Sequence, residues 1–190
     1  MTQVARQYWG HIGPEKIAAL PYAFWPTLEQ DVTIDYPEDL LMTDAYGVAS
    51  VATEGLHTCH ALVIGALRNE ESVALYISHN YADESAATVA RARKALAFMT
   101  ATRHIPVIAA IMGPSDEWLG RSRFTKDASF EQVVAPLIRE CAAEVGIDLV
   151  AHHYGVGLAC NGLKLIRQPN SDEPFSLNVL RAEKSIPGCK

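Results

Sequence analysis

One cysteine and one histidine in this sequence have surroundings that suit nucleophilic chemistry. Cys59 ends the segment Thr-Glu-Gly-Leu-His-Thr-Cys, in which Gly55 permits a tight turn that would expose the sulfur. A thiol attacks a carbonyl group once a base removes its proton, and the backbone amide at such a turn can hold the resulting oxyanion. We therefore expect Cys59 to be a nucleophile and His79 to be its acid/base partner. From residue types alone, this is one Cys/His pairing among several.

Two predicted strands position this pair. Residues 60–67 form a short apolar run, and residues 72–78 alternate apolar with small or polar side chains, which suits a half-buried strand. A turn at residues 70–71 joins them, so the start of one strand and the end of the other lie together. His79 is expected just past a strand end, where it would face Cys59 across the sheet.

The rest of the pattern predicts further strands and two helices. Asp83 or Ser85 can cap the first helix, and Gly146 has the position of a residue that ends the second. The order of elements is not the strict alternation that enforces a doubly wound parallel sheet, so we expect an α/β fold, a layered mixed β-sandwich flanked by helices. The predicted strands are residues 46–52, 105–112, 147–153 and 162–167, and the predicted helices are residues 85–102 and 129–145.

The chain is long enough for one domain with a real core, and we expect a single domain spanning residues 1–190. Residues 1–45 are rich in aromatic residues and proline and are interpreted as an arm that wraps the core, with a short helix-like stretch near residues 14–20. Residues 46–168 form the predicted catalytic core, and residues 169–190 are predicted to be loop-like.

Composition excludes several classes of function. The net charge is −6 and the basic residues are scattered, so there is no stripe to bind a nucleic-acid backbone. The longest apolar runs are far shorter than a membrane span, and the first residues lack the features of a secretory signal. We expect a protein made in a cytoplasm, without a membrane partner; export or delivery into a target cell would need a route that reads no classical signal peptide.

Neither a disulfide framework nor a metal site is expected. The four cysteines, at positions 59, 141, 160 and 189, are far apart in a chain that can build its own core, so reduced thiols are predicted. His57, Cys59 and His60 are close in sequence, but neighbours on a strand point to opposite faces and no second ligand pair with zinc-site spacing follows. No metal or other cofactor is predicted.

The segment Thr53-Glu-Gly-Leu-His-Thr-Cys59 resembles the nucleophile motif of the chemoreceptor glutamine deamidases, T-x-G-L-G-S-C. Its Thr and Cys spacing is similar to that of the wider cysteine-dependent deamidase group, which includes the cytotoxic necrotizing factor catalytic domain and the Burkholderia lethal factor. The resemblance implies a deamidase-like fold, with Cys59 as nucleophile, His79 as general acid/base and Thr53 as the residue that fixes the histidine ring. It also implies that Thr58 and His57 line the site near the oxyanion position.

The implied reaction converts a glutamine of another protein to glutamate through a thioester. A protein substrate with a surface glutamine is therefore the expected partner. The chain departs from the chemoreceptor enzymes in lacking their twin glycine before the histidine, in having His57 where they have glycine, and in carrying the aromatic arm. These departures favour a bacterial toxin or effector over a housekeeping chemoreceptor enzyme.

Two other classes of function remain open at the level of sequence. One is a catalytically silent binding module that keeps the scaffold and uses the aromatic arm as a partner surface; retention of Thr53, Cys59 and His79 argues against it. The other is a papain-like protease or acyltransferase, although the chain lacks the helix-borne nucleophile with a distant histidine of that arrangement. Release of ammonia rather than cleavage of a peptide bond separates the two kinds of enzyme.

Overall fold

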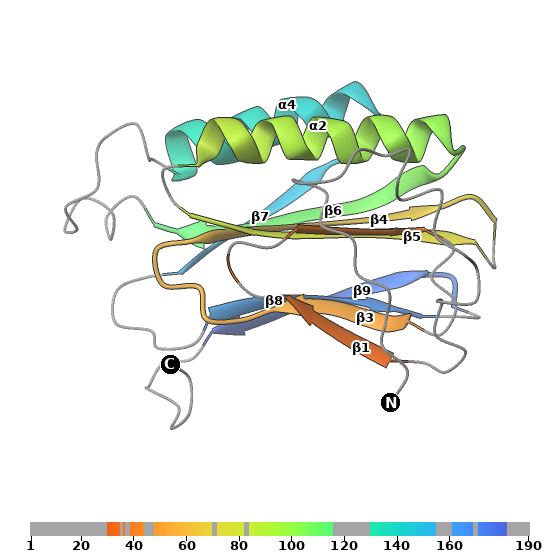
Figure 1. Cartoon of the computed structure of the whole chain (residues 1–190), viewed down its shortest axis with the longest axis horizontal. Helices are drawn as coiled ribbons and strands as arrows, with labels where there is room; N and C mark the ends of the chain where they lie inside the picture. Colours follow the sequence, from red (N-terminus) through yellow and green to blue (C-terminus); the bar gives the residue numbers. More distant parts are fainter. Residues whose placement is uncertain are drawn as a thin grey trace.

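Two β-sheets and a layer of helices make up the fold, which we describe from a computed structural model. The structure describes residues 30–34, 36, 39–43, 48–69, 72–81, 84–115, 130–154, 161–168 and 171–181. The helices cover one face of a five-stranded sheet, and a four-stranded sheet packs against its other face (Figure 1). The expected mixed, layered α/β sandwich with flanking helices is confirmed at this level.

The five-stranded sheet has the order β2-β5-β4-β6-β7. Its central strands are antiparallel, whereas β7 runs parallel to β6 at one edge. The strands are β2 (Asp39–Thr43), β4 (His60–Leu67), β5 (Val73–Asn80), β6 (Ile105–Pro114) and β7 (Leu149–Tyr154).

The four-stranded sheet has the order β1-β3-β8-β9. β1 is parallel to β3, and the other pairs are antiparallel. The strands are β1 (Gln30–Ile34), β3 (Val48–Thr53), β8 (Asn161–Arg167) and β9 (Phe175–Arg181).

The helical layer consists of α2 (Ser85–Ala101) and α4 (Ala135–Glu144), the latter preceded by a π-helical turn, η3 (Phe130–Val134). The prediction for the end of the second helix is confirmed: Gly146 has φ +79°, and the amide of Ile147 bonds back to the carbonyl of Ala142 at 3.1 Å, as in a Schellman motif. The predicted cap of the first helix is not: the N-cap is Glu84, without a side-chain capping bond, and Ser85 is the first helical residue.

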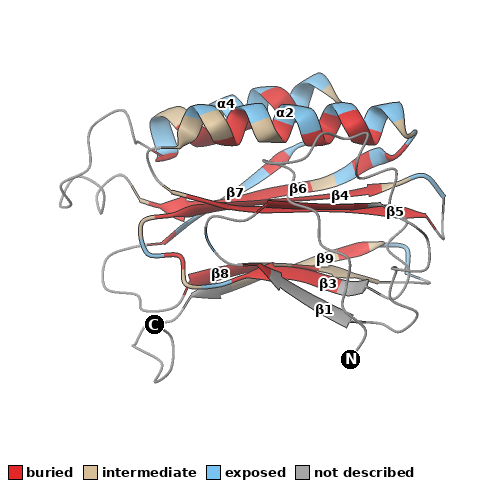
Figure 2. Ribbon diagram, in the orientation of Figure 1, coloured by how far each residue is buried: buried red, intermediate tan, exposed pale blue. Residues whose placement is uncertain are grey.

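Strands β4 and β5 are buried along almost their whole length because both of their faces are covered (Figure 2). Alternate residues enter two separate cores, so Leu62 and Ile64 of β4 pack toward the helices, whereas Ala61 and Val63 pack toward the other sheet. The same alternation in β5 sends Tyr76 to the helices and Ile77 to the other sheet. In these strands, even-numbered residues therefore face the helices and odd-numbered residues face the other sheet, and this also applies to polar side chains.

The N-terminal arm and the C-terminal tail contribute more regular structure than predicted. Residues 30–34 and 39–43, within the predicted arm, are strands β1 and β2, one in each sheet, and residues 175–181 of the predicted loop-like tail are strand β9. The predicted helix-like stretch near residues 14–20 lies outside the described residues. The prediction failed for these strands because short segments of mixed polarity gain their stability from pairing with strands far along the chain.

Among the described helices, none is both long enough and apolar enough to cross a membrane.

Candidate active site

The nucleophile candidate lies in the connection that leads from β3 into β4. Thr53 is the last residue of β3, Gly55 turns the chain with φ +72°, and Cys59 directly precedes the first residue of β4. No atom lies within 4 Å of a Cβ built on Gly55, so the positive φ rather than crowding requires glycine here. The predicted turn before Cys59 is thus present, and it joins the two sheets.

His79 lies inside β5, which ends at Asn80, rather than just past the strand end as predicted. It pairs in register with Ala61, two positions after Cys59, and the two strands are antiparallel. Ala61 and Cys59 both belong to the core between the sheets, and His79 shares the side of β5 occupied by Ile77. Cys59 and His79 therefore stand on the same face of neighbouring strands, in the diagonal arrangement in which side chains can meet.

A hydrogen bond across the sandwich holds His79. The Oγ1 atom of Thr53 in the four-stranded sheet lies 2.8 Å from His79 Nδ1 in the five-stranded sheet. The single hydroxyl hydrogen of Thr53 is donated to the carbonyl of Ile34 at 2.9 Å, so Thr53 must accept the hydrogen of Nδ1. In that tautomer the basic lone pair of His79 is on Nε2.

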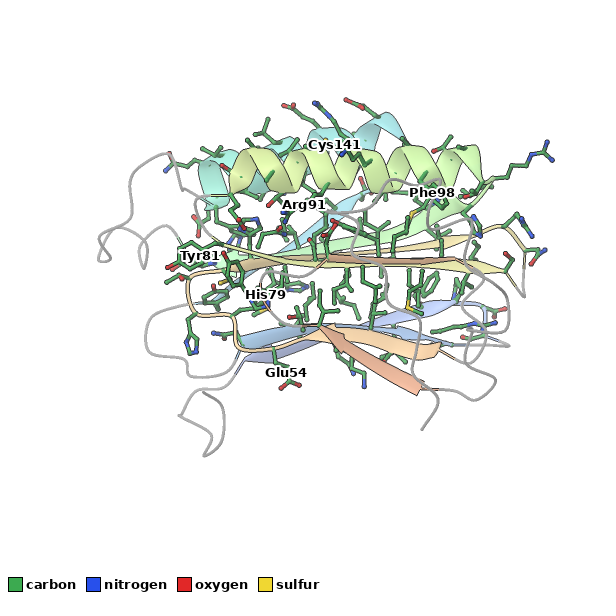
Figure 3. The ribbon with its side chains drawn as sticks, viewed as in Figure 1. Glu54, His79, Tyr81, Arg91, Phe98 and Cys141 are labelled. Atoms are coloured by element: carbon green, nitrogen blue, oxygen red, sulfur yellow. The ribbon has the colours of Figure 1, made fainter. Side chains whose placement is uncertain are left out.

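Both members of the pair are shielded from water. Cys59 is 8% exposed, His79 is 3% exposed and Thr53 is fully buried. Figure 3 shows His79 in the space between the sheets and Tyr81 at the end of the same strand. Chemistry at this position would proceed largely out of contact with bulk solvent.

The electrostatic surroundings of Cys59 favour its protonated form. Burial raises the pKa of the thiol to about 11, and the carboxylate of Glu84 acts in the same direction. Hydrogen bonds from the backbone and the side chain of Thr58 lower the pKa but do not offset the burial. At neutral pH Cys59 rests as a thiol, so its attack requires a base that takes the proton as the new bond forms.

Side chains that the sequence did not single out hold the nucleophile segment in place. Asn161 Nδ2 donates to the carbonyl of Leu56 at 2.9 Å, and the amide of Leu56 donates to the carbonyl of Asn161 at 3.1 Å. The hydroxyl of the buried Tyr154 donates to the carbonyl of Cys59 at 2.5 Å. Strands β7 and β8 thereby fix both ends of the turn.

Gly162 allows this close packing. A Cβ at this position would lie 2.7 Å from the carbonyl oxygen of Thr53, which is a backbone atom that cannot swing away. The sequence placed Gly162 only as the first residue of the predicted strand 162–167, because the approach of one strand to another is not visible in a local pattern.

The N-terminal arm supplies a residue that contacts His79. The ring of Tyr36 makes an edge contact with the ring of His79, at a centroid distance of 5.9 Å, and lies 5.8 Å from the ring of Tyr81. Tyr36 itself is 46% exposed. Nothing in the sequence connected Tyr36 to the cysteine motif, although it belongs to the aromatic arm.

A second polar cluster lies on the other face of β4 and β5, beneath helix α2. His60 Nε2 is 2.6 Å from Thr88 Oγ1, and Arg91 donates to Asn80 at 2.6 Å, which in turn donates to Ser78 at 2.8 Å. Burial lowers the pKa of His60 to about 3, and the electrostatic effects of His79 and Arg91 act in the same direction. His60 is therefore neutral and structural, and pleating separates it from Cys59.

The predicted wall residues differ in their surroundings. Thr58 is half-buried and forms hydrogen bonds with the Cys59 sulfur, whereas His57 is exposed. An oxyanion site at the amide of Cys59 stays a prediction. Within the described ranges, no group of three or more His, Cys, Asp or Glu side chains is arranged to hold a metal ion, and Cys59 and Cys141 are free thiols there.

Comparison with known proteins adds no relative to this description: no protein-family model matches the chain, and no curated protein matches it at a significant level.

Proposed function

We propose that this protein is a cysteine-dependent amidohydrolase that deamidates a glutamine side chain of another protein, on a deamidase-like fold. The observation that carries the proposal is the Thr53–His79 hydrogen bond, which joins the two sheets and sets the tautomer of the histidine. A nucleophile, a base and a third group that orients the base are the parts that acyl-transfer chemistry at an amide requires.

The proposed reaction begins with proton transfer from the Cys59 thiol to Nε2 of His79, while the sulfur attacks the carboxamide carbon. The carbon–nitrogen bond then breaks, and His79 returns the proton to the departing ammonia, leaving a thioester on Cys59. His79 next activates a water molecule, which hydrolyses the thioester to a glutamate side chain and the free thiol. Thr53 keeps Nδ1 protonated throughout, so Nε2 remains the atom that exchanges protons.

The burial of the site supports a carboxamide rather than a peptide bond as the substrate group. Cys59 is 8% exposed, and the ring of Tyr36 makes an edge contact with His79. A glutamine carboxamide is carried on a slender methylene stem, whereas a peptide bond brings two flanking residues with it. Side-chain deamidation therefore fits the approach to Cys59 better than proteolysis.

The departures from the chemoreceptor motif extend the proposal to a biological role, that of a bacterial effector or toxin acting on a protein of another cell. His57, which stands where the chemoreceptor motif has glycine, is exposed beside the nucleophile turn and can contact a protein substrate. A chemoreceptor-modifying role remains the alternative on the same chemistry.

The test compares the purified protein with two matched variants, Cys59→Ser and Cys141→Ser. Each is incubated with cell extract and glutamine-rich protein, ammonia is assayed, and peptides are searched by mass spectrometry for gains of about one dalton at glutamine, the change expected from amide hydrolysis. Cys141 is buried in the helical layer, away from the core that holds Cys59, so its variant controls for loss of a buried thiol.

Modification by the wild type and by Cys141→Ser, but not by Cys59→Ser, is the expected result. Cleaved peptides without deamidation would point to a protease instead. If extracts from several sources show no Cys59-dependent change of either kind, a catalytically silent binding module becomes the better description.

A further inference from the structure

Strand β1 ends and strand β2 begins next to residues of the site, although the two strands belong to different sheets. Ile34, the last residue of β1, pairs with Thr53, and Asp39, the first residue of β2, pairs with Ser78, next to His79. Tyr36 lies between these two points. The position of Tyr36 is thus set by two strands, each of which pairs with a strand that carries a site residue.

Tyr36 contacts two aromatic rings, those of His79 and Tyr81. Its ring meets His79 at an interplanar angle of 67° and Tyr81 at 55°, with centroid distances of 5.9 and 5.8 Å. These separations are within the range of favourable aromatic pairs. Tyr36 is 46% exposed while His79 is 3% exposed, so the tyrosine ring is an outer surface and the histidine ring lies behind it.

We infer that Tyr36 and Tyr81 form an aromatic collar that determines which groups reach Cys59. The collar admits a flat, slender carboxamide on a methylene stem, which can pass along aromatic faces, and it holds back branched or bulky groups. The identity of that carboxamide as glutamine rests on the proposed function, whereas the size selection of the collar does not.

This size selection can be measured without any substrate, because the reactivity of Cys59 reports access directly. Iodoacetamide is a small carboxamide reagent, and N-(1-pyrenyl)maleimide is a bulky one. The rates at which each reagent modifies Cys59 are followed by mass spectrometry of the Cys59 peptide, in the wild type and in Tyr36→Ala. Modification of the buried Cys141 in the same digest reports any unfolding.

The collar predicts that Tyr36→Ala accelerates the bulky reagent severalfold relative to iodoacetamide, because the ring that restricts the larger reagent is removed. Tyr36→Phe keeps the ring and retains the wild-type ratio. Ile105→Ala removes another exposed apolar side chain, 69% exposed and paired with Leu67 at the opposite end of β4, and also leaves the ratio unchanged. An unchanged ratio in Tyr36→Ala, with Cys141 unmodified, overturns the inference.

A second arm follows ammonia release from a glutaminyl dipeptide. The collar predicts a higher KM for Tyr36→Ala with a smaller change in kcat, because the ring guides the side chain but does not exchange protons. Selectivity between reagents, with no ammonia release from the dipeptide or from the protein extracts in any form, would uphold the collar and reject the deamidase. Ammonia release, with a reagent ratio in Tyr36→Ala that equals the wild-type ratio, would support the deamidase and reject the collar.

Discussion

Replacement of Thr53 by valine removes one hydroxyl and tests the central element of the site. Valine is close to threonine in shape, so the main change is the loss of the bond to Ile34 at 2.9 Å and the bond to His79 at 2.8 Å. The backbone carbonyl of Ile34 and the ring N–H of His79 then lose this partner, and both residues are buried. Each such loss costs about 1–3 kcal/mol, so the free energy of unfolding should fall by about 2–6 kcal/mol.

The effect on catalysis should be larger than the effect on substrate binding. Without Thr53 as acceptor, nothing favours the tautomer of His79 that is protonated on Nδ1. Nε2 is then protonated in part of the molecules and cannot act as the base there. General-base catalysis contributes about 10²–10⁴ in rate, so kcat should drop by about that factor while KM changes little. Thr53→Ser retains the hydroxyl and should keep most of the activity, at the cost of one buried methyl group.

Three measurements check this reasoning. Urea unfolding gives the stability, ammonia release from a glutaminyl peptide gives kcat and KM, and nitrogen-15 spectra of the imidazole give the tautomer of His79. The wild type should show a protonated Nδ1, and Thr53→Val should shift the population toward a protonated Nε2. A wild-type spectrum with the proton on Nε2, or full activity in Thr53→Val, would refute the assigned roles of both residues.

Three further predictions concern protonation and packing. Because the pKa of Cys59 is about 11 rather than the ordinary 9.0, its alkylation by iodoacetamide at pH 8 should be roughly a hundredfold slower than that of a free cysteine and should keep rising with pH up to about 11. The pKa of His60 is about 3 in the fold and 6.5 when unfolded, so between these pH values the unfolded chain binds one more proton than the folded chain. The free energy of unfolding should therefore fall by about 1.4 kcal/mol for each pH unit below pH 6.5. His60→Gln should remove this slope in urea titrations. Gly162→Ala would place a Cβ 2.7 Å from the carbonyl oxygen of Thr53 and should lower both stability and kcat, whereas Gly113→Ala, at 2.2 Å from an aromatic ring in the helical layer, should lower chiefly stability.

Each of these has an opposite outcome. An alkylation rate that levels off below pH 8 would mean that Cys59 is already a thiolate and that general-base attack is the wrong mechanism. An acid-induced loss of stability that is the same in His60→Gln would assign the loss to carboxylates. Equal effects of the two glycine substitutions on kcat would show that the approach of β8 to Thr53 has no special part in catalysis.

Much of the secondary structure was predictable because it is encoded locally. Strand β4 at His60–Leu67 and helix α2 at Ser85–Ala101 carry strong apolar patterns, and both predictions match the structure closely. The pairing of β4 with β5 also followed from a short turn between them. The placement of Cys59 and His79 at adjoining ends of neighbouring strands was therefore accessible from the sequence.

The sequence by itself determined the residue types at the site, a thiol, an imidazole and a hydroxyl, and the local segments that carry them. Only the tertiary structure decided that Thr53 reaches His79 from the other sheet, because a bond between sheets depends on how two layers pack and leaves no periodic signal. The same holds for Tyr154, Asn161 and Tyr36, whose contacts join segments far apart in the chain. Packing also decided the protonation of the thiol, since burial is a property of the folded core and raises the pKa of Cys59.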